Sequence, residues 1–278
     1  MDAWRTTAAT NNAEWCDLVC RSHGAQTLFD DDAWTSETRT PAYYPDAVTL
    51  VSDPSVPELL SRIDTSAGCS IKDSFASLDL TSHGFRTLFD AQWVVRASRA
   101  RPAPEAMSRA RQPPPAGPRW ELVRTPSDLD TWEQAWGGGA GPTGIFRAEL
   151  LEHDSVAVLA ARADQRVVAG AILNRSATVV GISNFFAESG VASAGWSGCL
   201  ALAGSLFPEA TFVGYESGDR LVDVRHHGFE TVGPLRVWIR SAVGAREAAP
   251  GPLCDRRDRE DIGRVDPLVD RPCQRPVS

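Results

Sequence analysis

The chain has 278 residues, of which 36 are acidic and 28 are basic, so its formal net charge is −8. With 42% hydrophobic and 23% charged residues, the composition is that of a globular protein and excludes disorder throughout. No apolar run reaches the roughly 18 residues of a membrane span, and residues 1–5 lack the pattern of a signal peptide. We therefore expect a cytoplasmic protein that binds neither membranes nor, given its acidic balance, nucleic acid.

The first predicted helix carries Cys16, Cys20 and His23 on one face, because spacings of four and three residues return to the same side of a helix. These residue types can bind metals, but a metal needs a fourth ligand and the neighbouring sequence supplies no matching pair. None of the six cysteines forms a Cys-x-x-Cys pair. We therefore predict buried cysteines on an amphipathic helix and no metal site.

A repeat relates the two halves of the chain at a shift of 144 positions. Residues 79–87, which read DLTSHGFRT, align with residues 223–231, DVRHHGFET, and five of the nine positions are identical. Trp93 and Trp238 miss each other by one position, which puts them on opposite faces of their strands unless a bulge intervenes. The shift also aligns two helix-like runs upstream. The repeat predicts a duplicated unit of helix, strand, helix and final strand.

Two segments have the composition of linkers rather than of domains. Residues 100–118 are rich in Pro, Ala and Arg, and their three consecutive prolines cannot continue a helix or a central strand. Residues 242–278 show no hydrophobic period, so we predict a mostly disordered tail. The sequence therefore predicts two domains, residues 1–99 and residues 119–241.

The second predicted domain begins with a strand from Arg119 and a helix that Ser127 or Asp128 caps. A glycine-rich loop over 137–144 precedes a short helix over 145–152. This loop is not a phosphate-binding loop, because it follows a helix and lacks the Lys-Ser/Thr ending. The remaining pattern predicts a hairpin of strands over 155–162 and 166–173, a strand over 177–186 with a candidate bulge at Gly181, a helix over 195–206, a strand over 211–215, a helix over 219–227 and a strand over 230–240.

The order of these elements resembles the fold of the GCN5-related N-acetyltransferase (GNAT) superfamily. Residues 219–233, DRLVDVRHHGFETVG, are similar to the family's last helix, which ends in Gly-Phe, and to the strand that follows it. The resemblance covers residues 119–241 well and residues 1–99 in part, since we find no central hairpin in the first half. It implies an α/β protein with a mixed sheet, a tandem acyl-CoA N-acyltransferase (GNAT-like) fold with a truncated N-terminal copy.

The resemblance implies acetyl-CoA or another acyl-CoA as cosubstrate, with its pyrophosphate at a helix N-terminus. The family's loop there reads Arg or Gln, two residues, Gly, one residue, Gly or Ala. The corresponding residues 188–198, ESGVASAGWSG, have no Arg or Gln, and Glu188 has the wrong sign. In the first half, prolines within residues 51–57 remove N–H donors, so we expect no CoA there. The cofactor-binding residues that this comparison predicts are Gly181, Ser183, Asn184, Gly195 and Ser197.

Many members of the family carry a tyrosine four residues before the glycine of Gly-Phe, where it protonates the leaving thiolate. The corresponding residues here are Val224 and Leu80, which cannot donate a proton. The resemblance therefore points to Tyr215 or Glu216, at the end of the preceding strand, as the replacement. In this fold the strands around residues 183–184 and 215–216 part to admit pantetheine and substrate. Glu216 then acts as base toward an amine if burial raises its pKa, and Ser183 or an N–H near Gly181 supports the oxyanion.

Other polar and aromatic residues have two interpretations each. In the resembling fold the region of Phe146 and Glu149 covers the acceptor site. These two residues therefore contact the acceptor, or else they belong to an ordinary amphipathic helix. Residues 43–46, YYPD, line a pocket or form an aromatic turn against the sheet. His226 and His227 are a catalytic base, or they complement the dipole at a helix C-terminus.

Three functions are compatible with these observations. The first is an acyl-CoA-dependent N-acyltransferase that acts on a small amine, with residues 119–241 as the catalytic unit. The second is a catalytically degenerate GNAT-like module that binds a ligand or a protein, which the missing tyrosine and the poor phosphate loop favour. The third is a transferase that uses aminoacyl-tRNA in place of CoA; the acidic charge and the single lysine, Lys72, argue against it.

Overall fold

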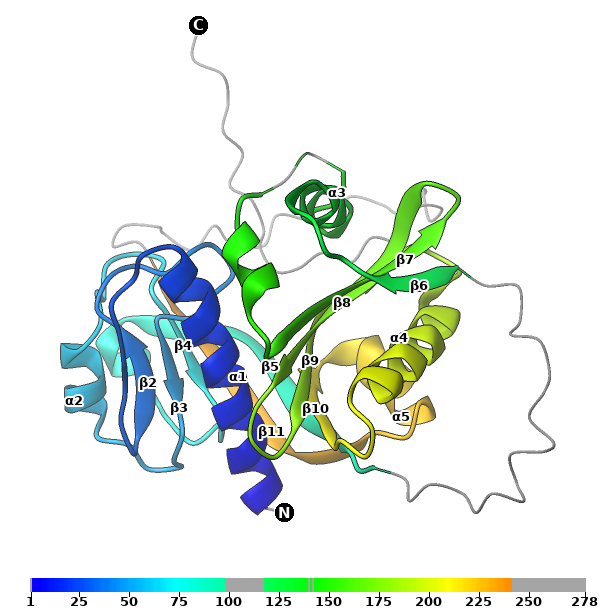
Figure 1. Cartoon of the computed structure of the whole chain (residues 1–278). Helices are drawn as coiled ribbons and strands as arrows, with labels where there is room; N and C mark the ends of the chain where they lie inside the picture. Colours follow the sequence, from blue (N-terminus) through cyan, green and yellow to red (C-terminus); the bar gives the residue numbers. More distant parts are fainter. Residues whose placement is uncertain (1, 99–117, 140, 142, 242–278) are drawn as a thin grey trace, which may run out of the picture.

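The computed structural model describes residues 2–98, 118–139, 141 and 143–241, so the predicted tail and, except for residue 118, the predicted linker lie outside the described residues. The described residues form one mixed sheet of eleven strands in the order β1-β2-β3-β4-β11-β5-β10-β9-β8-β7-β6 (Figure 1). The first half contains α1 (Asp2–Ser22), β1 (Thr27–Phe29), β2 (Ala33–Ser36), β3 (Ala47–Thr49), α2 (Val56–Ser61), β4 (Ser70–Asp73), the 3₁₀ turn η1 (Thr81–His83) and β5 (Phe85–Arg96). The second half contains β6 (Arg119–Leu122), α3 (Pro126–Trp136), η3 (Ala148–Glu152), β7 (Val156–Ala163), β8 (Arg166–Arg175), β9 (Val180–Ala187), α4 (Ala192–Leu206), β10 (Phe212–Glu216), α5 (Gly218–His226) and β11 (Glu230–Arg240).

The two halves repeat one pattern of strand pairing. In the first half β1 and β2 are antiparallel, β2 and β3 are antiparallel, and β3 and β4 are parallel. In the second half β7, β8, β9 and β10 pair in the same succession. The expectation that the first half lacks the hairpin is therefore wrong. Its strands have three and four residues, too few for hydrophobic alternation to reveal them.

The last strand of each half completes the sheet of the other half. β5 pairs with β10, β11 pairs with β4, and β5 and β11 pair with each other at the centre, all antiparallel. Ala91 of β5 pairs with Leu235 of β11, which lies 144 positions further along the chain. The antiparallel pairing of the two central strands is therefore centred on equivalent residues of the repeat. The two halves are therefore joined by backbone hydrogen bonds in a single sheet.

The two tryptophans that the repeat sets one position apart face opposite sides of this sheet. Trp93 packs in a cluster with Ala8 of α1, whereas Trp238 packs in a cluster with Leu59 of α2. The register shifts once in each central strand, between Thr231 and Gly233 in β11 and between Thr87 and Phe89 in β5. These bulges occupy equivalent positions of the repeat, so both strands are shifted alike. Trp93 and Trp238 therefore still face opposite sides of the sheet. The prediction of opposite faces is confirmed.

Helices cover both faces of the sheet. One face carries α1 and α3, whose apolar side chains share a core cluster with β2, β3, β7 and β8. The other face carries α2 over the first half and α4 and α5 over the second. Cys16 and Cys20 are buried on α1, as predicted. Among the described residues, no helix combines the length and the apolar character needed to cross a bilayer.

Helix α1 belongs to the first half but packs on strands of the second. Asn11 Nδ2 donates to the carbonyl oxygen of Asn174 on β8 at 3.1 Å, and Asn174 Nδ2 donates to the carbonyl oxygen of Asn11 at 3.0 Å. Both residues are buried, with 2% and 3% exposure. A Cβ on Gly181 of β9 would lie 2.0 Å from Asn11 Oδ1, so the glycine is required for this close approach. The halves thus share one core.

Two predicted helices of the second half differ from the structure. α3 begins at Pro126, and its N-cap is Thr125, whose hydroxyl accepts from the backbone N–H of Asp128; proline fits the first helical position because its missing N–H is not needed there. The predicted helix over 145–152 is instead a 3₁₀ turn over Ala148–Glu152.

Candidate functional site

The parallel strands β9 and β10 part after a short pairing. Their register covers two positions, Phe212 opposite Val180 and Val213 opposite Gly181. Beyond it, β9 has a bulge against β8, because Gly170 pairs with Phe186 and Ile172 with Ser183, so two β9 residues face one β8 residue. Asn184 lies in this bulge with a left-handed φ of 53°. The bulge is therefore at Asn184, not at Gly181, and it turns the end of β9 away from β10.

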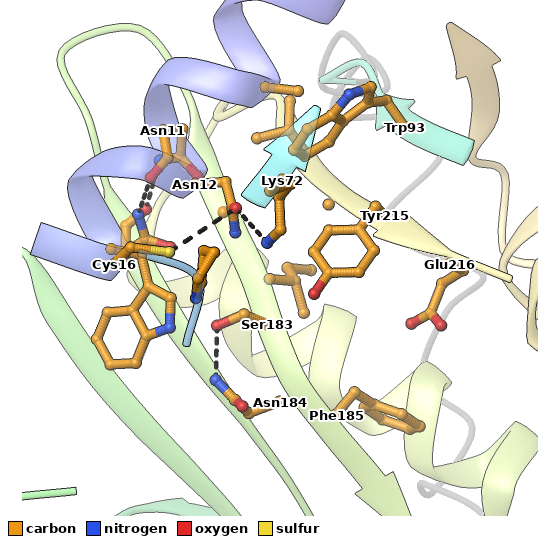
Figure 2. A pocket seen from close by; sticks show the side chains of 18 of the residues that line it. Asn11, Asn12, Cys16, Lys72, Trp93, Ser183, Asn184, Phe185, Tyr215 and Glu216 are labelled. Atoms are coloured by element: carbon orange, nitrogen blue, oxygen red, sulfur yellow. Dashed lines mark hydrogen bonds between the residues drawn. The ribbon is translucent and has the colours of Figure 1, made fainter. Parts of the chain in front are cut away.

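A pocket with a volume of about 260 Å³ lies where the two strands part. The second half contributes predicted site residues to its lining, and the first half contributes side chains from α1, from the loop before β3 and from β4 (Figure 2). The lining includes Gly181, Ser183, Asn184, Tyr215 and Glu216 from the second half, and Asn12, Cys16, Tyr43, Tyr44 and Lys72 from the first.

Glu216 ends β10 in a largely enclosed position. Its side chain is 14% exposed, and its nearest cation is Arg220, at 4.0 Å. Burial raises the pKa of Glu216 from 4.5 to about 7; Arg220 opposes this shift and Asp223 adds to it. This is the direction expected for a carboxyl group that loses water contact. Near neutral pH both the protonated and the ionised form of Glu216 are therefore populated.

Tyr215 and Glu216 face opposite sides of the sheet. The Tyr215 ring packs edge-on against Trp93, with 5.6 Å between the ring centroids, on the face that α1 covers. Glu216 lies toward α5, which carries Arg220. Both line the pocket, so side chains from the two faces of the sheet meet there, beside the gap between β9 and β10.

Lys72 is a pocket residue that the sequence reasoning missed. It lies on β4 with 4% exposure. Its Nζ donates to Asn12 Oδ1 at 2.6 Å and lies 4.4 Å from the centroid of the Tyr215 ring. Its being the only lysine of the chain was the available signal. What brings it to the pocket is the pairing of β4 with β11, which no local pattern encodes.

Tyr44 fulfils both interpretations of the segment 43–46. Its ring is buried and packs against Trp15, with 6.4 Å between centroids, and it also lines the pocket. Its hydroxyl is buried without a hydrogen-bond partner among the described residues. Burial holds the pKa of Tyr44 well above its usual range, so the hydroxyl keeps its proton.

The helix that would receive a cofactor pyrophosphate begins earlier than predicted. α4 starts at Ala192, and the N–H of Gly195 donates to the carbonyl oxygen of Val191 at 2.7 Å. Gly195 and Ser197 therefore lie inside the helix and outside the pocket lining. The N–H groups without partners in the preceding turn are those of residues 192–194. Glu188, which has the wrong sign for this site, is paired with Arg166.

An aromatic stack occupies the space between β9 and α4. Phe185 lies flat on Trp196, with 4.0 Å between centroids and 19° between planes. Phe185 also lines the pocket. The stack therefore links the pocket lining to α4 through an aromatic contact.

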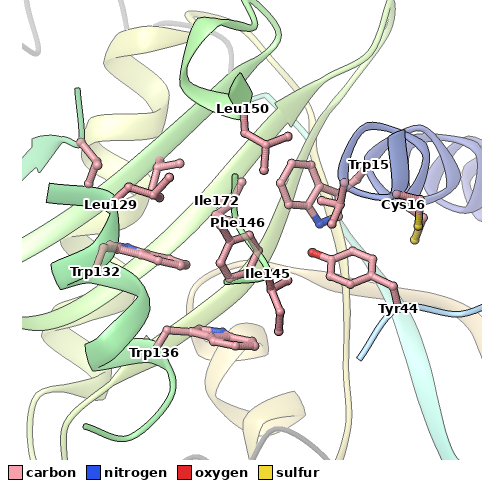
Figure 3. Packing of buried hydrophobic residues seen from close by; sticks show 14 of the residues in the cluster. Trp15, Cys16, Tyr44, Leu129, Trp132, Trp136, Ile145, Phe146, Leu150 and Ile172 are labelled. Carbon is pink, nitrogen blue, oxygen red and sulfur yellow. The ribbon is translucent and has the colours of Figure 1, made fainter. Parts of the chain in front are cut away.

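The two predicted acceptor residues lie away from the pocket lining. Phe146 is buried against Trp132 and Trp136, with centroid distances of 5.3 and 5.1 Å (Figure 3). Glu149 is exposed on η3. Glu133 accepts hydrogen bonds from the backbone N–H groups of residues 144–146. These bonds keep the segment before η3 extended, so the 3₁₀ turn begins after Phe146 and the Phe146 ring lies in the core.

In the equivalent region of the first half, one hydrogen bond joins the ends of β3 and β4. Thr49 Oγ1 accepts from the N–H of Ser74 at 2.9 Å, just beyond the two paired positions of these strands. The carboxylate of Asp73 accepts from the N–H groups of Phe75 and Leu78, which stabilises the turn that follows β4. Among the described residues, no group of three or more His, Cys, Asp or Glu side chains is placed to hold a metal.

No protein-family model and no curated protein sequence matches the chain. Solved structures do resemble it. A GCN5-related N-acetyltransferase from Kribbella flavida has a TM-score of 0.53 at 13% identity, over 84% of this chain and 95% of that one. A GCN5-related N-acetyltransferase-like protein from Streptococcus suis 89/1591 has a TM-score of 0.49 at 13% identity, over 86% of this chain and 99% of that one.

The similarity to the Kribbella protein covers 84% of this chain and therefore extends over both halves. At this level of identity the similarity establishes the fold and leaves the chemistry to the residues of the site. The chain has the fold of the GCN5-related N-acetyltransferase superfamily.

Proposed function

We propose that the protein is an acyl-CoA-dependent N-acyltransferase that acts on a small amine at the gap between β9 and β10. The observation that carries this proposal is a pocket at this gap that is lined by side chains from both faces of the sheet and contains a carboxyl group whose pKa lies near neutral pH. In this proposal the first half is a structural partner that supplies one wall of the pocket. The two halves descend from a duplicated unit.

The residues of the pocket can move the protons of acyl transfer and can stabilise the negative charge that forms on the acyl oxygen. The acyl-CoA supplies the acyl group as a thioester; a bond forms from the amine nitrogen to the acyl carbon and the carbon–sulfur bond breaks. Glu216 takes the proton that the amine loses and returns one to the departing sulfur. Backbone N–H groups freed by the bulge at Asn184 stabilise the oxyanion in place of those near Gly181. Tyr215 lines the acceptor side of the gap.

The described residues fit an acyl-CoA in two respects. The parted strands leave room for the thioester arm, and the first turn of α4 offers the N–H groups of residues 192–194 to the pyrophosphate. The pairing of Glu188 with Arg166 neutralises the acidic charge beside this turn. Gly195 and Ser197 follow the turn, so we assign them a supporting role in the helix.

The test is thiol release from acetyl-CoA with a panel of small amines, on wild type and on Glu216→Gln. We expect turnover by the wild type and a loss of about 100-fold or more in the variant, the usual effect of removing a general base. Glu230→Gln, an exposed change on β11, is the matched control and should keep wild-type turnover. Unchanged turnover in Glu216→Gln would remove Glu216 from the mechanism.

A second candidate is a GNAT-like module that binds a ligand without chemistry. Two observations favour it: Val224 occupies the position of the family's tyrosine and is fully buried, and residues 188–198 lack the Arg or Gln of the family's phosphate-binding loop. A thermal-shift titration with acetyl-CoA, CoA and tRNA separates the candidates, because a ligand of the native state raises the melting temperature. Stabilisation by CoA without turnover supports the binding module; stabilisation by tRNA alone would contradict both candidates.

A further inference from the structure

The pocket contains a buried positive charge that no carboxylate of the described residues neutralises. Lys72 is 4% exposed, and all ion pairs among the described residues use arginine rather than this lysine. Its contacts are the amide oxygen of Asn12 and the face of Tyr215. Both are weak compensation, because an ammonium group removed from water needs an opposite charge to recover its hydration energy.

The unused hydrogen-bonding capacity of Lys72 faces the pocket. An ammonium group has three donors, and one of them is directed to Asn12 Oδ1. Asn12 uses its oxygen in this contact, so its amide nitrogen adds a donor beside the ammonium group. Figure 2 shows Lys72 between Asn12 and Tyr215, with Ser183 on the opposite wall. An anion placed here would receive several hydrogen bonds, one of them from a charged donor.

The pocket therefore has two chemically different ends. Lys72 and Asn12 are at the end that α1 covers, on the same side of the sheet as Tyr215. Glu216 is at the other end, beside α5. A ligand that carries a negative group at one end and an amine at the other matches this arrangement.

We propose that the acceptor is an amino acid, or another small amine that carries a carboxylate, with its carboxylate bound by Lys72 and Asn12 and its amine directed toward Glu216. The role of the amine rests on the proposed function, whereas the binding of the carboxylate does not. A carboxylate is favoured over a phosphate because its single charge matches that of Lys72. A second negative charge would have no cation beside it at this end of the pocket, because Arg220, the other cation of the lining, pairs with Glu216.

The test is calorimetric and thermal-shift binding to the whole chain without any CoA. The probes are the twenty L-amino acids, then the carboxamide and the decarboxylated amine of the tightest binder, with inorganic phosphate as a separate anion. We expect at least one amino acid to bind, and about tenfold or more tightly than its carboxamide, as for other charge-assisted hydrogen bonds. Equal binding of acid and carboxamide, binding of no amino acid, or stabilisation by phosphate alone would each overturn the proposal.

Two variants assign the effect to Lys72. Lys72→Met keeps the length of the side chain and removes the charge, so it should abolish the preference for acid over carboxamide. Arg86→Met, an exposed change on β5 that alters the net charge equally, should keep it. The ligand-free Lys72→Met protein should melt no lower than wild type, because it no longer buries a charge without a counter-ion. If Lys72→Met keeps the preference, the proposal is wrong; if it does not fold, the wild-type comparison of acid and carboxamide still decides.

These outcomes separate this inference from the proposed function. An amino acid that binds through Lys72 and is never acylated would support the inference and contradict acyl transfer. Equal acylation of amines with and without a carboxylate would support acyl transfer and overturn the inference.

Discussion

Gly84 and Gly228 take the same left-handed backbone conformation, with φ angles of 81° and 85°, although they are 144 residues apart. The N–H of each donates to the carbonyl three residues earlier, at 3.0 Å in both halves. The buried phenylalanine that follows each glycine donates its N–H to the carbonyl five residues earlier, at 3.2 Å from Phe85 and 3.1 Å from Phe229. Two turns of equal geometry therefore start the two central strands, which supports a duplicated unit.

Replacing either glycine by alanine should destabilise the protein. A Cβ is disfavoured in the left-handed region by about 1–2 kcal/mol, and we expect Gly84→Ala and Gly228→Ala to lower the free energy of unfolding by that amount each in urea titrations. Gly204→Ala is the control, because Gly204 lies in α4 and nothing beyond the adjoining helix backbone comes within 4 Å of the position that a Cβ would occupy; it should gain about 0.5–1 kcal/mol. A neutral Gly228→Ala variant would contradict the equivalence of the two turns.

The two reciprocal hydrogen bonds between Asn11 and Asn174 should each help to hold α1 on β8. Each side-chain amide donates to the backbone carbonyl of the other residue, so Asn11→Ala and Asn174→Ala each leave one buried carbonyl without this donor and should each cost about 1–3 kcal/mol. Because alanine keeps both carbonyls, each single substitution leaves the other hydrogen bond in place. Urea titrations of the two variants measure these losses. Losses below about 0.5 kcal/mol in both variants would mean that apolar packing, and not these hydrogen bonds, holds α1 on β8.

Glu133 should anchor the segment before η3. It is 2% exposed, and its carboxylate accepts from Thr143 Oγ1 and from the backbone N–H groups of residues 144–146. In Glu133→Gln an amide NH₂ faces some of these donors, so we expect a loss of about 2–3 kcal/mol in unfolding free energy and faster amide exchange at residues 144–146. Glu149→Gln, on the exposed surface of η3, should change stability by less than about 0.5 kcal/mol.

Glu216 should make stability fall as pH rises toward neutrality. Its folded-state pKa of about 7 exceeds the ordinary 4.5, so the folded state holds this proton more tightly than the unfolded state does. Its destabilising effect is absent below about pH 4.5 and complete above about pH 7, where it reaches at most about 3 kcal/mol. Glu216→Gln should therefore melt higher than wild type at pH 8, with a smaller difference at pH 5. An equal difference at both pH values would show that the pKa is not raised.

Local sequence was sufficient for the hairpin of the second half and for the repeat. The strands predicted over 155–162 and 166–173 agree within two residues with β7 and β8, because long alternating runs bounded by turn residues carry their own signal. The same reasoning failed for β1 and β2, which are too short to alternate visibly. It also placed the start of α4 at Gly195, three residues late, because residues 192–194 carry no distinctive cap.

The sequence by itself determined the two related halves and the position of Tyr215 and Glu216 at the end of a strand, since these depend on periodicity and spacing along the chain. Its resemblance to the GCN5-related N-acetyltransferases implied the fold class. Only the tertiary structure decided which side chains meet them. Asn12 and Lys72 reach the pocket because α1 packs across β8 and β9 and because the last strands of the two halves change places. Which strand pairs with which is settled by burial and backbone hydrogen bonds between residues far apart in the chain, and these contacts have no local signature.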